Sequence, residues 1–191
     1  MDTVLTVAAL RALTPPASST AVLRLGYYEP LADGVRVHIY NGSDTRPENG
    51  GTVIVPDSNP GTGRWNLKHA GEASVCDFGA KFDDATDDTA AIQAINACAE
   101  IRRIRYPARI GRYASTLVLD GYKKHIGFGH RVDPAAPGHS TGLRYTGSGD
   151  AATLFAAHLE GLCFLGSGSA HDGLVVGQRD PVHMAGGCSL K

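Results

Sequence analysis

Residues 76–101 read CDFGAKFDDATDDTAAIQAINACAEI, and this stretch decides the fold. It opens with a strand-like segment at Val75–Ala80, passes through an acidic turn and continues into one helix, expected at about Asp87–Arg102. Short apolar runs separated by glycine and proline follow that helix. A helix placed directly before a series of short strands is suited to capping a coil of stacked strands, whose first turn otherwise exposes backbone groups and apolar core.

The expected helix has start and stop signals. Thr86 is a suitable N-cap, and acidic residues after it are favoured at the positive end of a helix. Three arginines lie at or past the other end, where cations are favoured. Its small-residue apolar face would consist of Ala91, Ile92, Ile95, Cys98 and Ala99. Such a face permits a close approach to a flat surface.

The chain after Pro107 predicts strands and no further helix. The expected strands are Ser115–Leu119, Ile126–Phe128, Gly142–Tyr145, Ala152–Phe155, Leu162–Leu165 and Gly173–Val176. Parallel strands need long crossovers in an ordinary sheet, whereas a coil connects them by winding, so that each turn stacks on the previous one. We therefore predict a mainly β fold in which residues 75–191 form the helix-capped start of a parallel β-helix.

Residues 1–70 predict a separate, small β-rich module. A helix is expected at Thr3–Leu13, with Thr6 or Thr3 as its cap and two prolines after it. The expected strands are Ala21–Leu25, Val35–Tyr40, Gly51–Val55 and Gly63–Leu67. In the second of these strands, Val35, Val37 and Ile39 share one face. His69–Ser74 is expected to be a linker.

The segments Asp77–Lys81 and Thr86–Ala94 resemble the N-terminal motif of the pectate-lyase-like superfamily. In that family the motif opens a right-handed parallel β-helix, and it is common in bacteriophage tailspikes. Upstream pieces also resemble the small β-module that precedes the β-helix of tailspikes: Val7–Leu13, Leu25–Tyr28, Asn49–Ile54 and Gly63–Trp65. The resemblance covers about residues 4–165. It implies a homotrimer attached to a virion through residues 1–70.

Two segments depart from the family pattern. The family has a glycine-flanked acidic turn after Lys81, whereas this chain has Phe82–Ala85. Ile104–Tyr113 carries an insertion and extra arginines, which would face either a partner protein or solvent. The chain ends at Ala185–Lys191 without an obvious capping element. This is expected either of part of a longer protein or of copies that cover one another.

Composition excludes several functional classes. The 191 residues contain 18 Lys and Arg and 19 Asp and Glu, a net charge of −1, which argues against nucleic acid and anionic membranes as main partners. No run is long enough for a membrane helix, and the N-terminus lacks the pattern of a secretory signal. The four cysteines form no C-x-x-C pair and are expected to be free thiols.

No catalytic constellation is visible, so the catalytic residues stay unknown. The acidic residues of the predicted coil form no tight pair in sequence and are expected to be solvated turn carboxylates: Asp120, Asp133, Asp150, Glu160, Asp172 and Asp180. Asp83, Asp84, Asp87 and Asp88 do not match a calcium loop. The histidines at 125, 130, 171 and 183 are too isolated for a zinc site. We expect no metal and no cofactor.

Other candidate residues are given structural roles. Gly166–Ser169 is expected to be a loop and not a phosphate cradle, and Ser189 has no nucleophile pattern around it. Trp65, Tyr27 and Tyr28 could stack on sugar, although aromatic residues more often lie in a core or a subunit contact.

The predicted function is that of a structural spike protein on a phage tail, or on a phage head, that adsorbs to host surface polysaccharide through a more distal part. The alternative is a polysaccharide depolymerase, a lyase or a glycoside hydrolase, whose active site lies beyond or deep in the β-helix. A third possibility is a bacterial β-helix protein unrelated to virions.

Overall fold

The computed structural model describes residues 2–31, 33–119, 122–128, 140–154, 157–166, 175–176 and 189–190. They belong to two compact units. Unit 1 comprises Met1–Ala70 and Asp77–Gly79, and unit 2 comprises Gly71–Cys76 and Ala80–Lys191. The chain therefore crosses from one unit to the other three times, after residues 70, 76 and 79.

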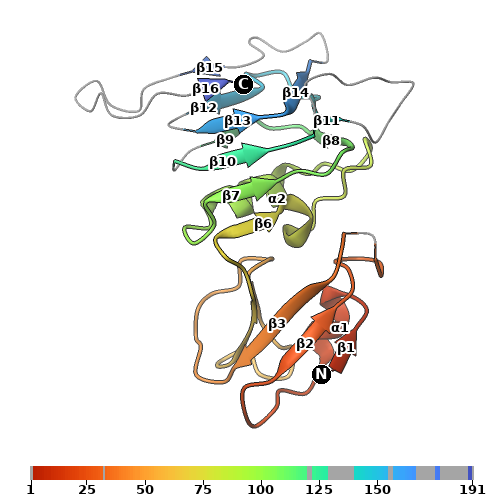
Figure 1. Cartoon of the computed structure of the whole chain (residues 1–191), viewed down its shortest axis with the longest axis vertical. Helices are drawn as coiled ribbons and strands as arrows, with labels where there is room; N and C mark the ends of the chain where they lie inside the picture. Colours follow the sequence, from red (N-terminus) through yellow and green to blue (C-terminus); the bar gives the residue numbers. More distant parts are fainter. Residues whose placement is uncertain are drawn as a thin grey trace, which may run out of the picture. The chain divides into compact units, whose positions relative to one another are not determined.

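Unit 1 is built on a five-stranded sheet with the order β1-β2-β3-β5-β4 (Figure 1). The strands are β1 (Asp2–Val4), β2 (Ala21–Arg24), β3 (Arg36–Asn41), β4 (Val53–Ile54) and β5 (Arg64–Leu67). The pairing of β1 with β2 is parallel and the other pairings are antiparallel. The expected strands are thus present with slightly different ends.

The N-terminal helix is shorter than predicted. Helix α1 spans Val7–Ala12, because Asp2–Val4 is drawn into the sheet beside β2. Thr6 is the N-cap, and its hydroxyl accepts a hydrogen bond from the backbone of Ala9 at 3.2 Å. A side-chain cap of this kind stabilises a helix by about 1 kcal/mol.

The core of unit 1 lies between α1 and one face of the sheet. Val7 and Leu10 from the helix pack in one cluster with Val22, Tyr40 and Trp65 from the strands. Val37 and Ile39 share a face of β3, and Val35 directly precedes the strand, as the alternation predicts. The buried face of β3 is the opposite one, however, with His38 0% and Tyr40 4% exposed. We call the surface made of Ala21, Leu23, Val35, Val37 and Ile39 the outer face.

Unit 2 is a parallel β-helix. Its first sheet, ordered β16-β13-β10-β7-β6, consists of β6 (Glu72–Ser74), β7 (Arg103–Arg105), β10 (Lys124–Ile126), β13 (His158–Glu160) and β16 (Ser189–Leu190). The second contains β8 (Ile110–Tyr113), β11 (Thr141–Tyr145) and β14 (Leu162–Leu165), and the third β9 (Leu117–Leu119), β12 (Ala152–Leu154) and β15 (Val175–Val176). Successive strands enter successive sheets, so the chain winds in a coil (Figure 1). The predicted fold class is confirmed.

The region joining the two units differs from the prediction. The expected linker contains strand β6, and the expected strand at Val75–Ala80 is instead the 3₁₀ helix η1 (Val75–Phe78). Strands β7, β8 and β13 were not predicted. Each is three or four residues long, which is too short for alternation alone to distinguish from a turn.

Helix α2 spans Thr89–Ala97, which is shorter than the predicted Asp87–Arg102. Thr86 is not its N-cap, because the Thr86 hydroxyl and backbone N–H both donate to Asp83, at 2.9 and 2.7 Å. The helix ends where Cys98 adopts an extended conformation. Ile92 and Ile95 are fully buried, as expected of the apolar face, whereas Ala99 lies outside the helix and is exposed. None of the described helices is long and apolar enough to cross a membrane.

Candidate functional site

Helix α2 caps the first turn of the coil through specific side chains. Strand β9 is the terminal strand of its sheet, so one edge of its backbone lacks a neighbouring strand. The Gln93 side-chain amide donates to the carbonyl of Thr116 at 3.1 Å, and that of Asn96 donates to the carbonyl of Val118 at 2.8 Å. These bonds satisfy edge carbonyls that otherwise offer a template for strand addition. The cap inferred from the sequence is present.

A buried lysine fixes the C-terminal end of the same helix. The Nζ of Lys123, which is 3% exposed, donates to the carbonyls of Ile95 and Cys98. A cation is favoured at this end of a helix. Burial lowers the pKa of Lys123 below its usual value. The arginines predicted for this role do not fill it, because Arg103 and Arg105 lie on β7 and pair with Glu72.

The acidic turn before α2 is held by its own carboxylates. Asp83 accepts from the backbone of Ala85 and Thr86, and these bonds lower its pKa to about 2. Asp88 accepts from the backbone of Lys81 and Phe82 at 2.7 and 3.1 Å. Burial raises the pKa of Asp88. The aspartates therefore serve the turn, and in the described part of the chain no cluster of three or more His, Cys, Asp or Glu could hold a metal ion.

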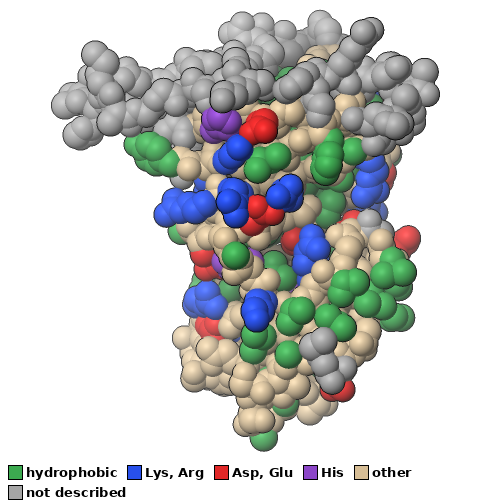
Figure 2. Space-filling model, viewed as in Figure 1, with side chains coloured by type: hydrophobic (Ala, Val, Ile, Leu, Met, Phe, Trp, Pro, Cys, Tyr) green, Lys and Arg blue, Asp and Glu red, His purple; other side chains and the backbone are tan. Residues whose placement is uncertain are grey.

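The outward side of the first β-helix sheet carries a ladder of ion pairs. Glu72 pairs with Arg103 at 2.9 Å and also with Arg105, and Glu160 pairs with Lys124 at 2.6 Å. Figure 2 shows basic and acidic side chains together in this part of the surface. Because these side chains are largely exposed, each pair contributes little to stability. Glu160 is engaged in the ladder.

The remaining candidates of the coil are not brought together as a catalytic group among the described residues. His125 is fully buried, and its Nδ1 lies 2.9 Å from the hydroxyl of Tyr106. Asp150 contributes its backbone carbonyl to the Thr116 hydroxyl at 2.6 Å. The other candidates lie outside the described side chains: Asp120, Asp133, Asp172, Asp180, His130, His171, His183, residues 167–169 of the Gly166–Ser169 loop and the Ser189 side chain. The catalytic residues thus stay unknown.

Asp77, inside the recognised motif, is the most buried acid of unit 1. Its Oδ1 accepts from Arg24 Nη2 at 3.1 Å and from Arg36 Nε at 2.6 Å. Asp77 and Arg24 are each 1% exposed. Burial lowers the pKa of Arg24, and Asp77 opposes that shift. Asp77 therefore supplies the counter-charge for an arginine buried under the sheet.

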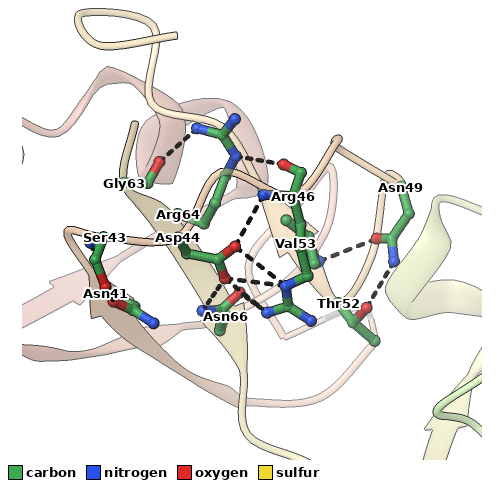
Figure 3. A network of polar contacts seen from close by, with 10 residues as sticks. All are labelled: Asn41, Ser43, Asp44, Arg46, Asn49, Thr52, Val53, Gly63, Arg64 and Asn66. Carbon is green, nitrogen blue, oxygen red and sulfur yellow. Dashed lines mark hydrogen bonds and ion pairs between the residues drawn. The ribbon is translucent and has the colours of Figure 1, made fainter. Parts of the chain in front are cut away.

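A polar network orders the loop after β3 (Figure 3). Asp44, which is 8% exposed, accepts from Arg46 Nη2 at 2.7 Å and from the Asn66 amide at 2.9 Å. Arg64 Nε donates to the Arg46 carbonyl at 2.6 Å. The bonds from Arg46 hold the pKa of Asp44 well below its usual range.

Beside this network lies a shallow groove of about 470 Å³, lined by Ala17–Ser19, Ile39–Ser43 and Asn66. The Asn66 amide is engaged in the network, and the side-chain Oδ1 of Asn41 accepts from the Ser43 hydroxyl. The groove is therefore lined by both polar and apolar residues, with no charged group among them.

The aromatic candidates divide between the core and the surface. Trp65 is 1% exposed and packs against Tyr40, with ring centroids 5.1 Å apart. The Tyr27 hydroxyl donates to the carbonyl of Gly50 at 3.1 Å, and Tyr27 packs on the core. Tyr28 is 52% exposed, and its hydroxyl donates to the Gly79 carbonyl at 3.0 Å. Trp65 and Tyr27 are thus parts of the packing of unit 1.

Known proteins match both units. Residues 3–70 match the model of a family described as the phage tail protein small four-stranded beta-sheet domain. The chain is also similar in structure to tailspike protein gp49 from the Acinetobacter baumannii bacteriophage Fri1, a capsular polysaccharide depolymerase. That similarity has a TM-score of 0.71 at 17% identity and covers 92% of this chain and 35% of that one.

Two further solved structures are similar to this chain over most of its length. Full-length tailspike protein 2 from an Escherichia coli O157:H7 bacteriophage matches with a TM-score of 0.69 at 18% identity, over 97% of this chain and 24% of that one. The Pantoea stewartii protein WceF, a glycan biofilm modifying enzyme with a tailspike-like parallel beta-helix fold, matches with a TM-score of 0.67 at 18% identity, over 94% of this chain and 28% of that one.

The chain therefore has the fold of tailspike-like parallel β-helix proteins, and its residues 3–70 match the model of a phage tail β-sheet domain. It spans about a quarter to a third of the length of the structures it matches. The match of residues 3–70 to a phage tail domain indicates a location in the tail of a phage virion.

Several of the residues that matter here were missed by sequence reasoning. Gln93 and Asn96 are spaced one helical turn apart, a signal that could have identified one polar side of the helix. The role of Lys123 could not be predicted from the sequence, because its partners, the backbone carbonyls of Ile95 and Cys98, lie 28 and 25 residues away. Arg24 and Asp77 are separated by 53 residues, and a single sequence does not reveal such pairs.

Proposed function

We propose that this chain is the virion-proximal part of a homotrimeric tailspike. Unit 1 attaches the spike to the tail, and unit 2 begins the β-helix that carries a distal part to host surface polysaccharide. The observation that supports this most is the presence, in one chain, of a match to a phage tail domain and of a helix-capped β-helix with a tailspike fold.

Epitope tags in the two units test the direction of attachment. One tag is inserted after Gly61, in an exposed loop of unit 1 where an added Cβ would meet no atom within 4 Å. The matched tag follows Ser148, in an exposed turn of unit 2. In gold-labelled electron micrographs of assembled particles, we expect the unit 1 label next to the tail and the unit 2 label farther out. Absence of the chain from particles, or the reverse order of labels, contradicts the proposal.

The second candidate function is depolymerisation of a capsular or lipopolysaccharide chain. The observation that favours it is the likeness in fold to a protein described as a capsular polysaccharide depolymerase. Incubation of the chain with host polysaccharide, followed by measurement of new reducing ends and of unsaturated uronate absorbance, tests it. We expect no cleavage by these 191 residues, because Asp83 and Asp88 are engaged in the turn before α2 and Glu160 in an ion pair. Measurable cleavage would favour the enzyme.

A further inference from the structure

Unit 1 contains two asparagines that are followed directly by glycine, at Asn41–Gly42 and Asn49–Gly50. An asparagine in this position can lose its side-chain amide, because the backbone nitrogen of the next residue can attack its side-chain carbonyl carbon. A glycine leaves that nitrogen unhindered, since it has no Cβ. Asparagine is among the thermolabile residues of proteins. The two pairs share this chemistry, so the structure around each one decides which of them reacts.

Both asparagines fold back over the reacting nitrogen in the same way. The Oδ1 of Asn41 accepts a hydrogen bond from the backbone N–H of Ser43 at 3.2 Å. The Oδ1 of Asn49 accepts one from the backbone N–H of Gly51 at 3.1 Å. A bond from the side chain to the backbone two residues on is an Asx turn, and it holds the side-chain carbonyl near the peptide group in between. The starting geometry is therefore common to the two sites.

The fold holds Asn49 by two further hydrogen bonds (Figure 3). Its Oδ1 also accepts from the backbone N–H of Val53 at 3.0 Å, and its Nδ2 donates to the hydroxyl of Thr52 at 2.7 Å. Thr52 is 2% exposed. The next peptide is held as well, because the carbonyl of Gly50 accepts from the Tyr27 hydroxyl at 3.1 Å. The amide nitrogen that would have to leave Asn49 is thus bonded inside the loop.

Asn41 lies in an open turn at the end of β3. Asn41, Gly42 and Ser43 are all exposed, so water has access to the attacking nitrogen and to the amide that leaves. The Ser43 hydroxyl donates to the Oδ1 of Asn41 at 3.0 Å, beside the bond from the Ser43 backbone. Both donors therefore meet the oxygen on which negative charge develops during the attack, an arrangement that stabilises such an intermediate.

We propose that Asn41 is a site of spontaneous deamidation and that the fold protects Asn49 from the same reaction. The nitrogen of Gly42 bonds to the Cγ of Asn41, its proton passes through water to the side-chain amide, and the amide leaves as ammonia. The product is a cyclic succinimide. Water then opens the ring at either carbonyl and gives aspartate or isoaspartate. This chemistry does not depend on whether the chain is part of a tailspike.

The reaction changes the groove beside the polar network. Asn41 lines this groove together with Ile39 of the outer face, and none of the lining residues is charged. Deamidation adds a carboxylate there, to which the two donors of Ser43 bond more strongly than to an amide. The isoaspartate product also adds a methylene to the main chain, at the position where β3 pairs with Arg64 of β5.

Ageing of the purified full chain at pH 8 compares the two sites within one molecule. Cleavage after Glu48 by a glutamate-specific protease places the two asparagines on separate peptides, and mass spectrometry measures the fraction of each that has become an acid. We expect Asn41 to react at least about tenfold faster than Asn49, because the two further bonds of Asn49 must break first. In concentrated urea, where the fold is lost, the two rates are expected to become similar.

Each outcome of this comparison decides the proposal. Equal rates in the folded chain, a faster reaction of Asn49, or no reaction of Asn41 overturns it. A difference of the same size in urea would come from the neighbouring residues and not from the fold, and it also overturns the protection of Asn49.

The variant Gly42→Ala tests the attacking nitrogen. A Cβ at this position meets the Tyr40 ring at 3.4 Å, an ordinary contact, so we expect the variant to fold, which circular dichroism checks. Because the methyl group hinders the nitrogen, the rate at Asn41 is expected to fall at least about tenfold, while the rate at Asn49 stays as in the parent. A folded variant whose Asn41 reacts at the parent rate contradicts the mechanism.

Discussion

At the residue scale, the carboxylate of Asp77 accepts hydrogen bonds from both Arg24 and Arg36. Its loss would leave the charge of Arg24 buried and unpaired. Arg24 is 1% exposed, and its guanidinium donates to Asp77. Removing one partner of a buried ion pair typically costs about 3–5 kcal/mol, because the other charge remains buried and uncompensated. Asp77→Asn is therefore expected to lower the free energy of unfolding of unit 1 by about that amount, measured by urea denaturation.

The matched control is a more exposed pair in the same unit. Arg11 and Glu48 form an ion pair with side chains 32% and 23% exposed. Glu48→Gln is expected to cost no more than about 1 kcal/mol. Equal effects of the two substitutions would show that burial is not what gives Asp77 its importance.

The turn that departs from the family pattern stores local strain. Phe82 and Asp84 have φ angles of 52° and 57°, in the region where glycine is favoured. The sequence predicts an altered turn here, and the structure shows that the backbone keeps a glycine-type conformation without glycine. Phe82 compensates by burying its ring, with 1% exposure, against Tyr106 at a centroid distance of 5.9 Å.

Asp84 offers a test of that strain. Its exposed pair with Arg144, at 2.8 Å, contributes little. Asp84→Gly is expected to stabilise unit 2 by up to about 1 kcal/mol, because the left-handed backbone no longer carries a side chain. Asp83→Gly, the control, is expected to destabilise it, since Asp83 holds Ala85 and Thr86. Thermal unfolding measures both, and destabilisation by Asp84→Gly would contradict the account.

At the scale of elements, α2 stabilises the coil through side chains that bond to a strand edge. Asn96→Ala and Gln93→Ala replace these residues by a better helix former. Helix propensity alone would therefore raise the stability of unit 2. We expect the opposite, a loss of about 1 kcal/mol for each change, because the carbonyls of Val118 and Thr116 lose their donors. Hydrogen exchange and urea unfolding of the variants report the sign of the change.

The sequence allowed the prediction of elements where a pattern was long or a motif was specific. The recognised motif located α2 and the β-helix, and alternation located β3. It did not locate β7, in which Ile104 alone points inward between Arg103 and Arg105, because one apolar residue has no period. It also made α2 too long at both ends, because Thr86 is engaged by Asp83 and Cys98 is already extended. Which face of β3 is buried depends on α1, and the residues of β3 alone do not determine it.

At the scale of the whole molecule, each unit contains a buried histidine that couples folding to pH. Burial lowers the pKa of His38 in unit 1 and of His125 in unit 2 to about 3. Arg24 adds to the effect on His38, and Lys123 to that on His125. In the unfolded chain a histidine has a pKa of about 6.5. Above pH 6.5 both histidines are neutral in the folded and in the unfolded chain, so neither lowers the free energy of unfolding there.

Below that pH the unfolded chain binds a proton that the folded chain does not. Each histidine is therefore expected to reduce the free energy of unfolding by roughly 1.4 kcal/mol per pH unit as the pH falls from 6.5 toward 3. Urea midpoints at pH 7 and 5 measure the loss. In proton NMR, two imidazole resonances are expected to stay unshifted down to about pH 4. Titration of all the histidines near pH 6.5 would contradict the buried, neutral state.

The path of the chain between the units has a consequence for how such proteins exchange parts. Strand β6, at Glu72–Ser74, belongs to the coil, whereas Asp77–Gly79 belongs to the small sheet domain. A recombination breakpoint at residue 70 would separate Arg24 from Asp77, its carboxylate partner. A breakpoint at residue 79 would separate the coil from β6, its own first strand. Chimaeras made by a single splice must therefore inherit a segment 71–79 that is compatible with both parents.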